Sequence, residues 1–334
     1  MNAIKRSWAW LLLAVLVGCS DMIVTGPEQN SNMPDFESAW HTVKSVYPYF
    51  EFKHINWDSI YAVYRPRAEA ARGDEIDAVL LGMLGELRDG HVRLQTRGGA
   101  SVATYHPPRS EKDKFAYSPI VVRKYFDSEL LLSGDQKVEY QLLGGYIGYI
   151  YVATLRREEP VSEGFDQALS YLRETKGLII DVRHNGGGSD DNSIAILTRL
   201  IQSPIDLLPF PLPGGGMQQG QFVRPRGAFQ YTKPVVLLID GVCFSSCEDF
   251  AEMMKHVPTV TAIGDTTGGG SGAPALFPLP SGRQINVSTK DFRRYDGEPI
   301  EWNGVLPGVL VLQTVNDINQ GRDKQLEAAI EFLR

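Results

Sequence analysis

Two apolar runs, each followed by a glycine-containing turn and a helix-like segment, most constrain the fold of this chain. The first run, GLIIDVR at 177–183, precedes glycines at 186–188 and a helical pattern over 193–201. The second run, Val235 to Ile239, precedes a turn and a helix that begins near Ser246. Short apolar runs bounded by turn residues are typical of buried strands, and strands that alternate with helices stack in layers. The sequence therefore predicts a layered α/β domain.

The two parts of the chain differ in their periodicity. Apolar residues recur at three- and four-residue intervals over 34–90, which predicts an N-terminal helical bundle. From His91 to the end at residue 334 the pattern is mainly that of strands and intervening helices, which predicts a second, α/β domain over 91–334. The strands are expected over 91–96, 118–125, 129–133, 137–143, 146–155, 259–265 and 283–290, and further helices over 165–173 and 322–333. The Pro- and Gly-rich segment 203–233 is expected to be a loop, of the length that lids and substrate-facing segments often have.

The N-terminus has the features of an export signal. Two basic residues precede the apolar run 8–17, which is too short to span a bilayer comfortably and ends in LVGC at Cys19. This ending resembles a bacterial lipoprotein box, which predicts a signal peptide over 1–19, a lipid on Cys19 and attachment to a membrane. Ser20 after the cysteine favours the outer membrane by the same resemblance, and the polar stretch 20–33 is expected to be a flexible tether. An ordinary secretory signal is the alternative.

Charge and cysteine content narrow the partners and cofactors. A net charge of −7 argues against nucleic acid as the main partner. With Cys19 lipidated, only Cys243 and Cys247 remain, and a disulfide or two half-buried free thiols are both open. Cysteines and histidines do not lie at the spacing of zinc ligands, so we expect no zinc site. The acidic pair 190–191 is expected to charge the start of a helix, and a metal site there is the alternative.

Ser245 lies where the apolar run 235–239 passes into the following helix. A hydroxyl on a strand-to-helix turn is held out of the sheet, beside the free backbone N–H groups of the helix start. Those N–H groups can stabilise the oxyanion that attack by the hydroxyl creates. The position therefore suits a nucleophile, although serine is also a common N-cap residue.

Such a nucleophile needs a base, and two of the six histidines have suitable surroundings. His91 follows Asp-Gly at the boundary between a helix and a strand, and His184 adjoins the glycine-rich turn of DVRHNGGG at 181–188. Spacing alone does not decide between them. The glycines let backbone N–H groups approach an anion closely, either as a phosphate cradle or as an oxyanion hole shared with the N–H of Ser246. A GxxxxGK[ST] motif, which the phosphate interpretation would need, is absent from the sequence.

A set of motifs in order gives a resemblance to a known family. The segments are FESAW, INWDSIY, LGELRDGHVRL, YIGYI, GLIIDVRHNGGG, VLLIDGVCFSSCEDFAE, IGDTTGGGSG and IEWNGVLPGVLV. Over about residues 34 to 334 the chain resembles the tail-specific, or C-terminal-processing, serine peptidases, in the branch similar to the catalytic core of tricorn protease. The resemblance implies a crotonase/ClpP-like spiral catalytic core with an N-terminal helical bundle. A PDZ domain is not expected, because only about 50 residues separate His91 from YIGYI.

The resemblance also implies roles for individual residues. Ser245 would be the nucleophile, His91 the base, and Glu301 the acid that orients the base through an intervening group. The oxyanion donors would be Gly187 and Ser246, with Gly186 as the neighbouring alternative. Asp296 and Glu298 are nearby carboxylates that do not occupy the motif position.

Two positions depart from the family's patterns. The branch with a Ser–Lys dyad would carry its lysine at position 270, which is glycine here. A hydroxyl residue often precedes the histidine in tricorn-like members, and this chain has Gly90 there. The expected activity is that of a serine endopeptidase of the cell envelope, periplasmic or surface-exposed, which cleaves extended or unfolded segments without a metal or organic cofactor. The alternative is an inactive envelope lipoprotein that binds an apolar ligand or a peptide; the oligomeric state is left open.

Overall fold

A seven-stranded sheet forms the larger of two layered units in the computed structural model, which describes residues 32–207, 210–211, 217–218 and 220–334. The strand order is β15-β12-β11-β6-β5-β4-β3. From β15 to β5 neighbouring strands are parallel, whereas β4 and β3 run antiparallel to their neighbours. The strands are β3 (Leu131–Leu132), β4 (Val138–Leu143), β5 (Ile147–Val152), β6 (Gly177–Asp181), β11 (Val235–Ile239), β12 (Val260–Gly264) and β15 (Val309–Leu310).

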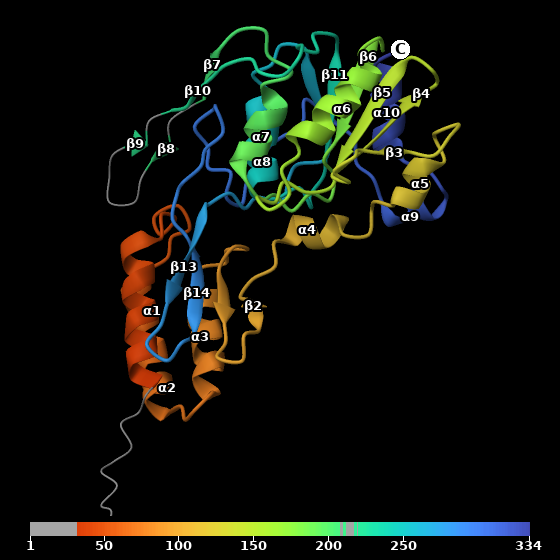
Figure 1. Cartoon of the computed structure of the whole chain (residues 1–334). Coiled ribbons are helices and arrows are strands. Elements are labelled where there is room, and N and C mark those ends of the chain that lie inside the picture. The colour runs from red at the N-terminus through yellow and green to blue at the C-terminus, as the bar shows by residue number, and fades with distance from the viewer. Residues whose placement is uncertain (1–31, 208–209, 212–216, 219) are drawn as a thin grey trace, which may run out of the picture.

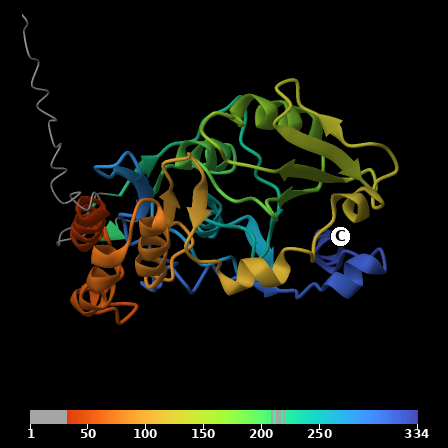
Figure 2. The same ribbon diagram turned by 90° about the horizontal axis from the view of Figure 1, so that it is seen from below.

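Helices cover both faces of this sheet (Figures 1 and 2). Helices α6 (Ser162–Leu172), α7 (Asp190–Leu197) and α8 (Ser246–Met254) lie on one face, and α10 (Lys324–Phe332) lies on the other. Successive residues of a strand point to opposite faces, so Leu237 of β11 joins the first core and Leu238 the second. Burial on both faces explains why β6 and β11 read as unbroken apolar runs.

The smaller unit packs three helices on a four-stranded antiparallel sheet. Phe36 and Leu80 from the helices share a core with Ile285 and Val287 from the sheet. The helices are α1 (Asn32–Val46), α2 (Trp57–Ala70) and α3 (Glu75–Gly85), and the sheet order is β13 (Pro274–Pro278), β14 (Gln284–Ser288), β1 (Arg93–Gln95) and β2 (Ser101–Ala103). The domain boundary predicted after residue 90 therefore falls inside a shared core, because β1 and two distant strands complete the helical layer.

The predicted strand over 118–125 is wrong, because Pro119–Arg123 forms helix α5. Proline at the first helical position is pre-set for a helix, and its missing N–H removes no intrahelical bond there. The helical turn buries the adjacent Val121 and Val122 and leaves Ile120 exposed. The apolar run therefore lacks the alternating burial that a strand would give it. Helices α4 (Pro108–Asp113) and α9 (Val315–Asn319) complete the connections.

Part of the expected loop at 203–233 is paired backbone. Strand β7 (Ile205–Asp206) pairs with β10 (Phe222–Val223), and β8 (Phe210–Pro211) pairs with β9 (Met217–Gln218). At the N-terminus, α1 already includes residues 32 and 33, the last two of the predicted tether. The predicted signal peptide and Cys19 lie outside the described residues. Across the described ranges, no helix combines the length and apolarity needed to cross a membrane.

Arg283, which is 1% exposed, ties the four-stranded sheet of the smaller unit to its helices. Its guanidinium pairs with Asp77, with Asp74 at 2.7 Å and with Asp35 at 3.3 Å. We expect Arg283→Met to lower the free energy of unfolding by about 3–5 kcal/mol, because Asp35 would remain buried without its charge partner. Urea unfolding would measure this. Arg322→Met, which removes a 2.6 Å ion pair from the surface, is the control and should lower the free energy of unfolding far less, because water screens an exposed pair. Equal losses in the two variants would contradict the prediction.

Candidate active site

Ser245 stands between β11 and α8 with strained backbone angles, φ 57° and ψ −131°. Such a conformation costs a residue other than glycine about 1–3 kcal/mol, and strained residues of this kind are common at functional sites. The turn is held by the N–H of Phe244, which donates to the carbonyl of Asn185 at 3.1 Å, and by the N–H of Gly268, which donates to the carbonyl of Cys243 at 2.9 Å. Ser245 is also the N-cap residue of α8, so the cap interpretation and the nucleophile interpretation describe the same position.

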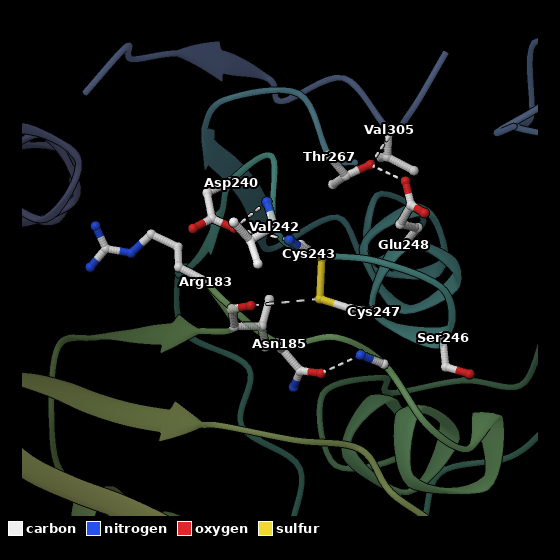
Figure 3. The surroundings of a disulfide bond; sticks show 12 residues. Arg183, Asn185, Asp240, Val242, Cys243, Ser246, Cys247, Glu248, Thr267 and Val305 are labelled. Atoms are coloured by element: carbon white, nitrogen blue, oxygen red, sulfur yellow. Dashed lines mark hydrogen bonds between the residues drawn. A yellow bond between two sulfur atoms is a disulfide. The ribbon is translucent and has the colours of Figure 1, made fainter. Parts of the chain in front are cut away.

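The fully buried carboxylate of Glu248 fastens this turn to the glycine-rich loop after β12. It accepts the N–H of Ser245 at 3.1 Å, the hydroxyl of Thr267 at 2.6 Å, and the N–H groups of Gly269 and Gly270 at 2.7 Å each. Figure 3 shows the contact between Glu248 and Thr267. Burial raises the pKa of Glu248 to about 7, although these hydrogen bonds favour its charged form. The turn that carries Ser245 and the glycine-rich loop after β12 are therefore held together by this one carboxylate.

A disulfide between Cys243 and Cys247 closes the turn from the other side (Figure 3). The Cα atoms lie 5.5 Å apart, within the range that a disulfide spans, and both residues are fully buried. Of the two arrangements that the sequence left open, the structure has the disulfide. Neither sulfur is available as a nucleophile, whereas Ser245, which lies between the two cysteines, lines a cavity.

An open cavity of about 750 Å³ lies in front of Ser245. It brings together Ser245, His91, Ser246, Gly186 and Gly187 from the predicted site residues. His184 does not line it: its ring nitrogen Nε2 lies 3.4 Å from Asp240 Oδ2, and its ring packs on Tyr117. The geometry thus favours His91 over His184 as the partner of Ser245.

His91 is 9% exposed, and its ring packs on that of Phe244 with the centroids 4.8 Å apart. Its backbone N–H donates to Asp89 Oδ1 at 2.8 Å, and its ring Nδ1 lies 4.0 Å from the same oxygen. Burial lowers the pKa of His91, with Asp89 acting in the opposite direction. A neutral imidazole can accept a proton, as a general base must. Within the described part of the chain no hydrogen bond joins His91 to Ser245; catalytic bonds of this kind often tighten only when substrate binds.

Glu301 is buried, and within the described ranges no hydrogen bond or ion pair joins it to His91. Its Oε1 accepts a 2.6 Å hydrogen bond from Lys53 Nζ, and both side chains are at most 1% exposed. Burial and the nearby Asp89 raise the pKa of Glu301. Neither Lys53 nor Asp89 is among the predicted site residues. Asp89 could have been noticed beside His91 in the motif, whereas the only signal for Lys53 is a cation within an aromatic-rich connection.

The rival carboxylates and the acidic pair have structural explanations. Asp296 pairs with Arg294 at 3.0 Å, and both Asp296 and Glu298 are exposed loop residues. The pair 190–191 begins α7, where the Ser189 hydroxyl accepts the N–H of Asp191 at 3.3 Å. In the described ranges, no cluster of side chains is suited to hold a metal ion.

The two predicted glycine donors of the oxyanion hole differ in their surroundings. The N–H of Gly187 donates to Asn185 Oδ1 at 2.8 Å, so this donor is already engaged. Gly187 has φ 86°, and a Cβ there would lie 2.4 Å from the carbonyl oxygen of Phe244, so only glycine fits this close approach. A Cβ on Gly186 would meet no heavy atom within 4 Å. Gly187 therefore lies against Ser246, with its Cβ position 2.8 Å from the Ser246 nitrogen, whereas the space around Gly186 is open.

The two positions that depart from the family's patterns are 90 and 270. The Phe244 ring occupies the space that a side chain at either position would need. A Cβ on residue 270 would lie 1.9 Å from Phe244 Cζ, and a Cβ on residue 90 would lie 2.8 Å from the same atom. A lysine at 270 or a hydroxyl residue at 90 would both require this ring to move. The aromatic ring thus replaces those side chains next to His91.

Gly270→Ala tests this packing. We expect a loss of about 1–3 kcal/mol in the free energy of unfolding, because the added methyl group must displace the Phe244 ring. Urea unfolding gives the value. The control is Gly98→Ala, where the nearest heavy atom to the new Cβ lies 3.8 Å away, and it should change stability by less than about 0.5 kcal/mol. If Gly270→Ala proved as harmless as its control, the ring would not fill this space.

Glu248 predicts a defined dependence of stability on pH. In the unfolded chain the carboxyl loses its proton near pH 4.5, and in the folded protein only near pH 7. Between these values the folded state holds the extra proton, so stability falls as pH rises, by up to roughly 3 kcal/mol. Urea unfolding of wild type and Glu248→Gln from pH 4.5 to 7.5 would show it as a slope that the variant lacks. Parallel curves for the two proteins would refute this origin of the pH dependence.

The chain is similar in sequence to known peptidases. Residues 146–311 match Peptidase family S41, and residues 29–85 match the Tricorn protease C1 domain. The carboxy-terminal processing protease CtpB of Bacillus subtilis is 25% identical over 229 residues, which cover 67% of this chain and 45% of that protein. The chain spans only 27% to 45% of the length of the curated relatives that it matches.

Solved structures show the same fold. A provisionally assigned peptidase from Parabacteroides merdae superposes with a TM-score of 0.79 at 27% identity, over 90% of this chain and 96% of that one. The tricorn protease superposes with a TM-score of 0.58 at 19% identity, over 92% of this chain and 36% of that one, which is a likeness of fold. The predicted α/β fold with a helical N-terminal region is confirmed. The chain belongs to peptidase family S41, a family of serine-type peptidases.

Proposed function

We propose that the protein is a serine endopeptidase that cleaves extended or unfolded peptide segments through an acyl-enzyme. One observation carries the proposal: a strained serine at a helix start and a buried histidine, its pKa lowered by burial, open onto the same cavity. A histidine with a lowered pKa is neutral at pH 7 and can take a proton, and the Ser245 hydroxyl lies next to the N–H of Ser246, the first residue of the helix.

The mechanism follows from these positions. His91 takes the proton of the Ser245 hydroxyl while its oxygen attacks the peptide carbonyl. The N–H groups of Ser246 and Gly186 hold the oxyanion, and Gly187 keeps its bond to Asn185. His91 then gives the proton to the leaving amine, and water releases the acyl group by the reverse path.

Two carboxylates support the base from different distances. Asp89 faces the imidazole, with its Oδ1 4.0 Å from Nδ1, and is placed to stabilise the imidazolium that forms during attack. Glu301, predicted as the orienting acid, binds the ammonium of Lys53. That ammonium holds the carbonyls of Leu87 and Arg88, in the backbone that leads to His91.

The cavity suits an extended peptide. Ala273 and Pro274, at the start of β13, line it together with Ser245. Strand β13 is at the edge of its sheet, and a peptide in extended conformation can add to such an edge. This supports unfolded or unstructured segments as substrates.

The proposed location is the cell envelope, with the protein held by a lipid on Cys19 to the outer membrane and facing the periplasm or the surface. The sequence LVGC before residue 20 supports lipidation. The Cys243–Cys247 disulfide supports an oxidising compartment, since such bonds are rare in the cytosol.

Labelling with a fluorophosphonate probe tests the proposed function. We expect the probe to modify Ser245, as located by mass spectrometry, and Ser245→Ala to abolish labelling. His91→Ala should slow labelling by about 10²- to 10⁴-fold, because the base is gone. The control His184→Ala should label normally, since that ring faces Asp240 and not the cavity. A folded wild-type protein that never labels would favour the inactive, ligand-binding alternative.

A further inference from the structure

Lys53 belongs to the connection between α1 and α2, yet its ammonium is buried behind the predicted base. Its side chain is fully buried, and Nζ donates to three oxygens: Glu301 Oε1 at 2.6 Å, the Leu87 carbonyl at 3.0 Å and the Arg88 carbonyl at 3.1 Å. An ammonium has three N–H donors, so each of them has a partner. A planar guanidinium would not direct its donors in this way.

These contacts join segments that are far apart in sequence. The carbonyls of Leu87 and Arg88 immediately precede Asp89, Gly90 and the predicted base, whereas Glu301 follows Lys53 by 248 positions. The neighbouring Trp302 strengthens the junction, since its indole N–H donates to the Arg88 carbonyl at 2.9 Å.

The same turn continues to the nucleophile. The backbone N–H of Trp302 donates to the carbonyl of Gly269 at 2.9 Å, and the N–H of Gly269 donates to Glu248, which also binds the N–H of Ser245. A continuous path of hydrogen bonds therefore runs from the carbonyls that Lys53 holds to the turn that carries Ser245.

The base and the nucleophile need such a junction because they come from different sheets. His91 leads into β1 of the four-stranded sheet, and Ser245 follows β11 of the seven-stranded sheet. A displacement of about 1 Å between reacting groups can cost about a hundredfold in rate. The position of one sheet relative to the other thus has to be fixed at the site.

We propose that Lys53 is a positioning residue, which binds the backbone before His91 to the Glu301 turn and so sets where the base stands relative to Ser245. The inference rests on the proposed function, in which His91 is the base. Lys53 touches neither the cavity lining nor the predicted nucleophile; it acts through the backbone of residues 87 and 88.

Lys53 also places a positive charge near the imidazole. Lys53 lowers the pKa of His91, and Asp89 raises it. Removing Lys53 should therefore raise the His91 pKa, which a purely structural loss elsewhere would not do. The other charged groups around the base are Glu301 behind it and Arg93, Arg156, Arg157, Asp190, Asp191 and Asp249 on the walls of the cavity.

The experiment uses the double variant Lys53→Met/Glu301→Gln, which removes both charges of the buried ion pair together. Glu301→Gln alone is the second variant, because it keeps both carbonyl bonds of Lys53. Lys44→Met is the matched control: it removes an ion pair of the same 2.6 Å length, from a lysine that is 47% exposed. Thermal unfolding shows which variants are folded.

Two readouts are taken from pH 5 to 9. One is the rate of fluorophosphonate labelling of Ser245, and the other is the His91 pKa from histidine NMR, with the signal assigned by its loss in His91→Ala. For the double variant we expect labelling about tenfold to a hundredfold slower at its plateau and a raised His91 pKa. Glu301→Gln should label at an intermediate rate, and Lys44→Met should match wild type in both readouts.

Any folded Lys53 or Glu301 variant with the wild-type rate and the wild-type His91 pKa would overturn the positioning role. The NMR readout separates this outcome from a failure of the proposed function. If wild type does not label at all, an unchanged His91 pKa in the double variant still refutes the placement by Lys53, and a raised pKa still supports it.

Discussion

The site depends on one buried carboxylate. Glu248 accepts hydrogen bonds from the N–H of Ser245 and from three groups of the loop after β12, namely the Thr267 hydroxyl and the N–H groups of Gly269 and Gly270. Without this acceptor, the backbone donors of a helix start and of a glycine-rich loop would face each other with no partner, which costs more than any single hydrogen bond gains. The strained conformation of the nucleophile turn persists because Glu248 on one side and the Cys243–Cys247 disulfide on the other determine it.

The two cores have different tasks at this site. The seven-stranded sheet, covered on both faces, supplies a rigid base for the nucleophile turn, because β11 is buried between β6 and β12. The smaller unit supplies His91 from the point where α3 leads into β1. The turn at Glu301 and Trp302 bonds to both units, through Lys53 and Arg88 on one side and Gly269 on the other. Such a division places the candidate base and nucleophile on separate scaffolds, with a cavity between them that is open to substrate.

Local sequence patterns predicted those parts of the molecule that local physics determines. The run at 235–239, the helix from Ser246 and the pairing of Ser245 with a helix start all follow from apolar patterning and turn chemistry, and the structure has them at the expected positions. The strand prediction for 118–125 is wrong because a proline starts a short helix there. A short apolar run gives the same signal for a buried strand and for a buried helix. Strand β13 and the ion pair between Lys53 and Glu301 depend on contacts across the whole chain, for which spacing carries no signal.

The ring of Phe244 accounts for glycine at positions 90 and 270, because it occupies the space that a side chain at either position would need. Its ring lies against His91, and a Cβ at residue 90 or 270 would come within 2.8 Å of it or closer. A lysine dyad and this aromatic ring therefore compete for one volume, and the ring takes it here. The ring packs on one side of the imidazole, and the burial of His91 as a whole is the main cause that lowers its pKa. Phe244 thus packs against His91 and leaves no room for a side chain at position 90 or 270, so glycine at those two positions and phenylalanine at 244 depend on one another.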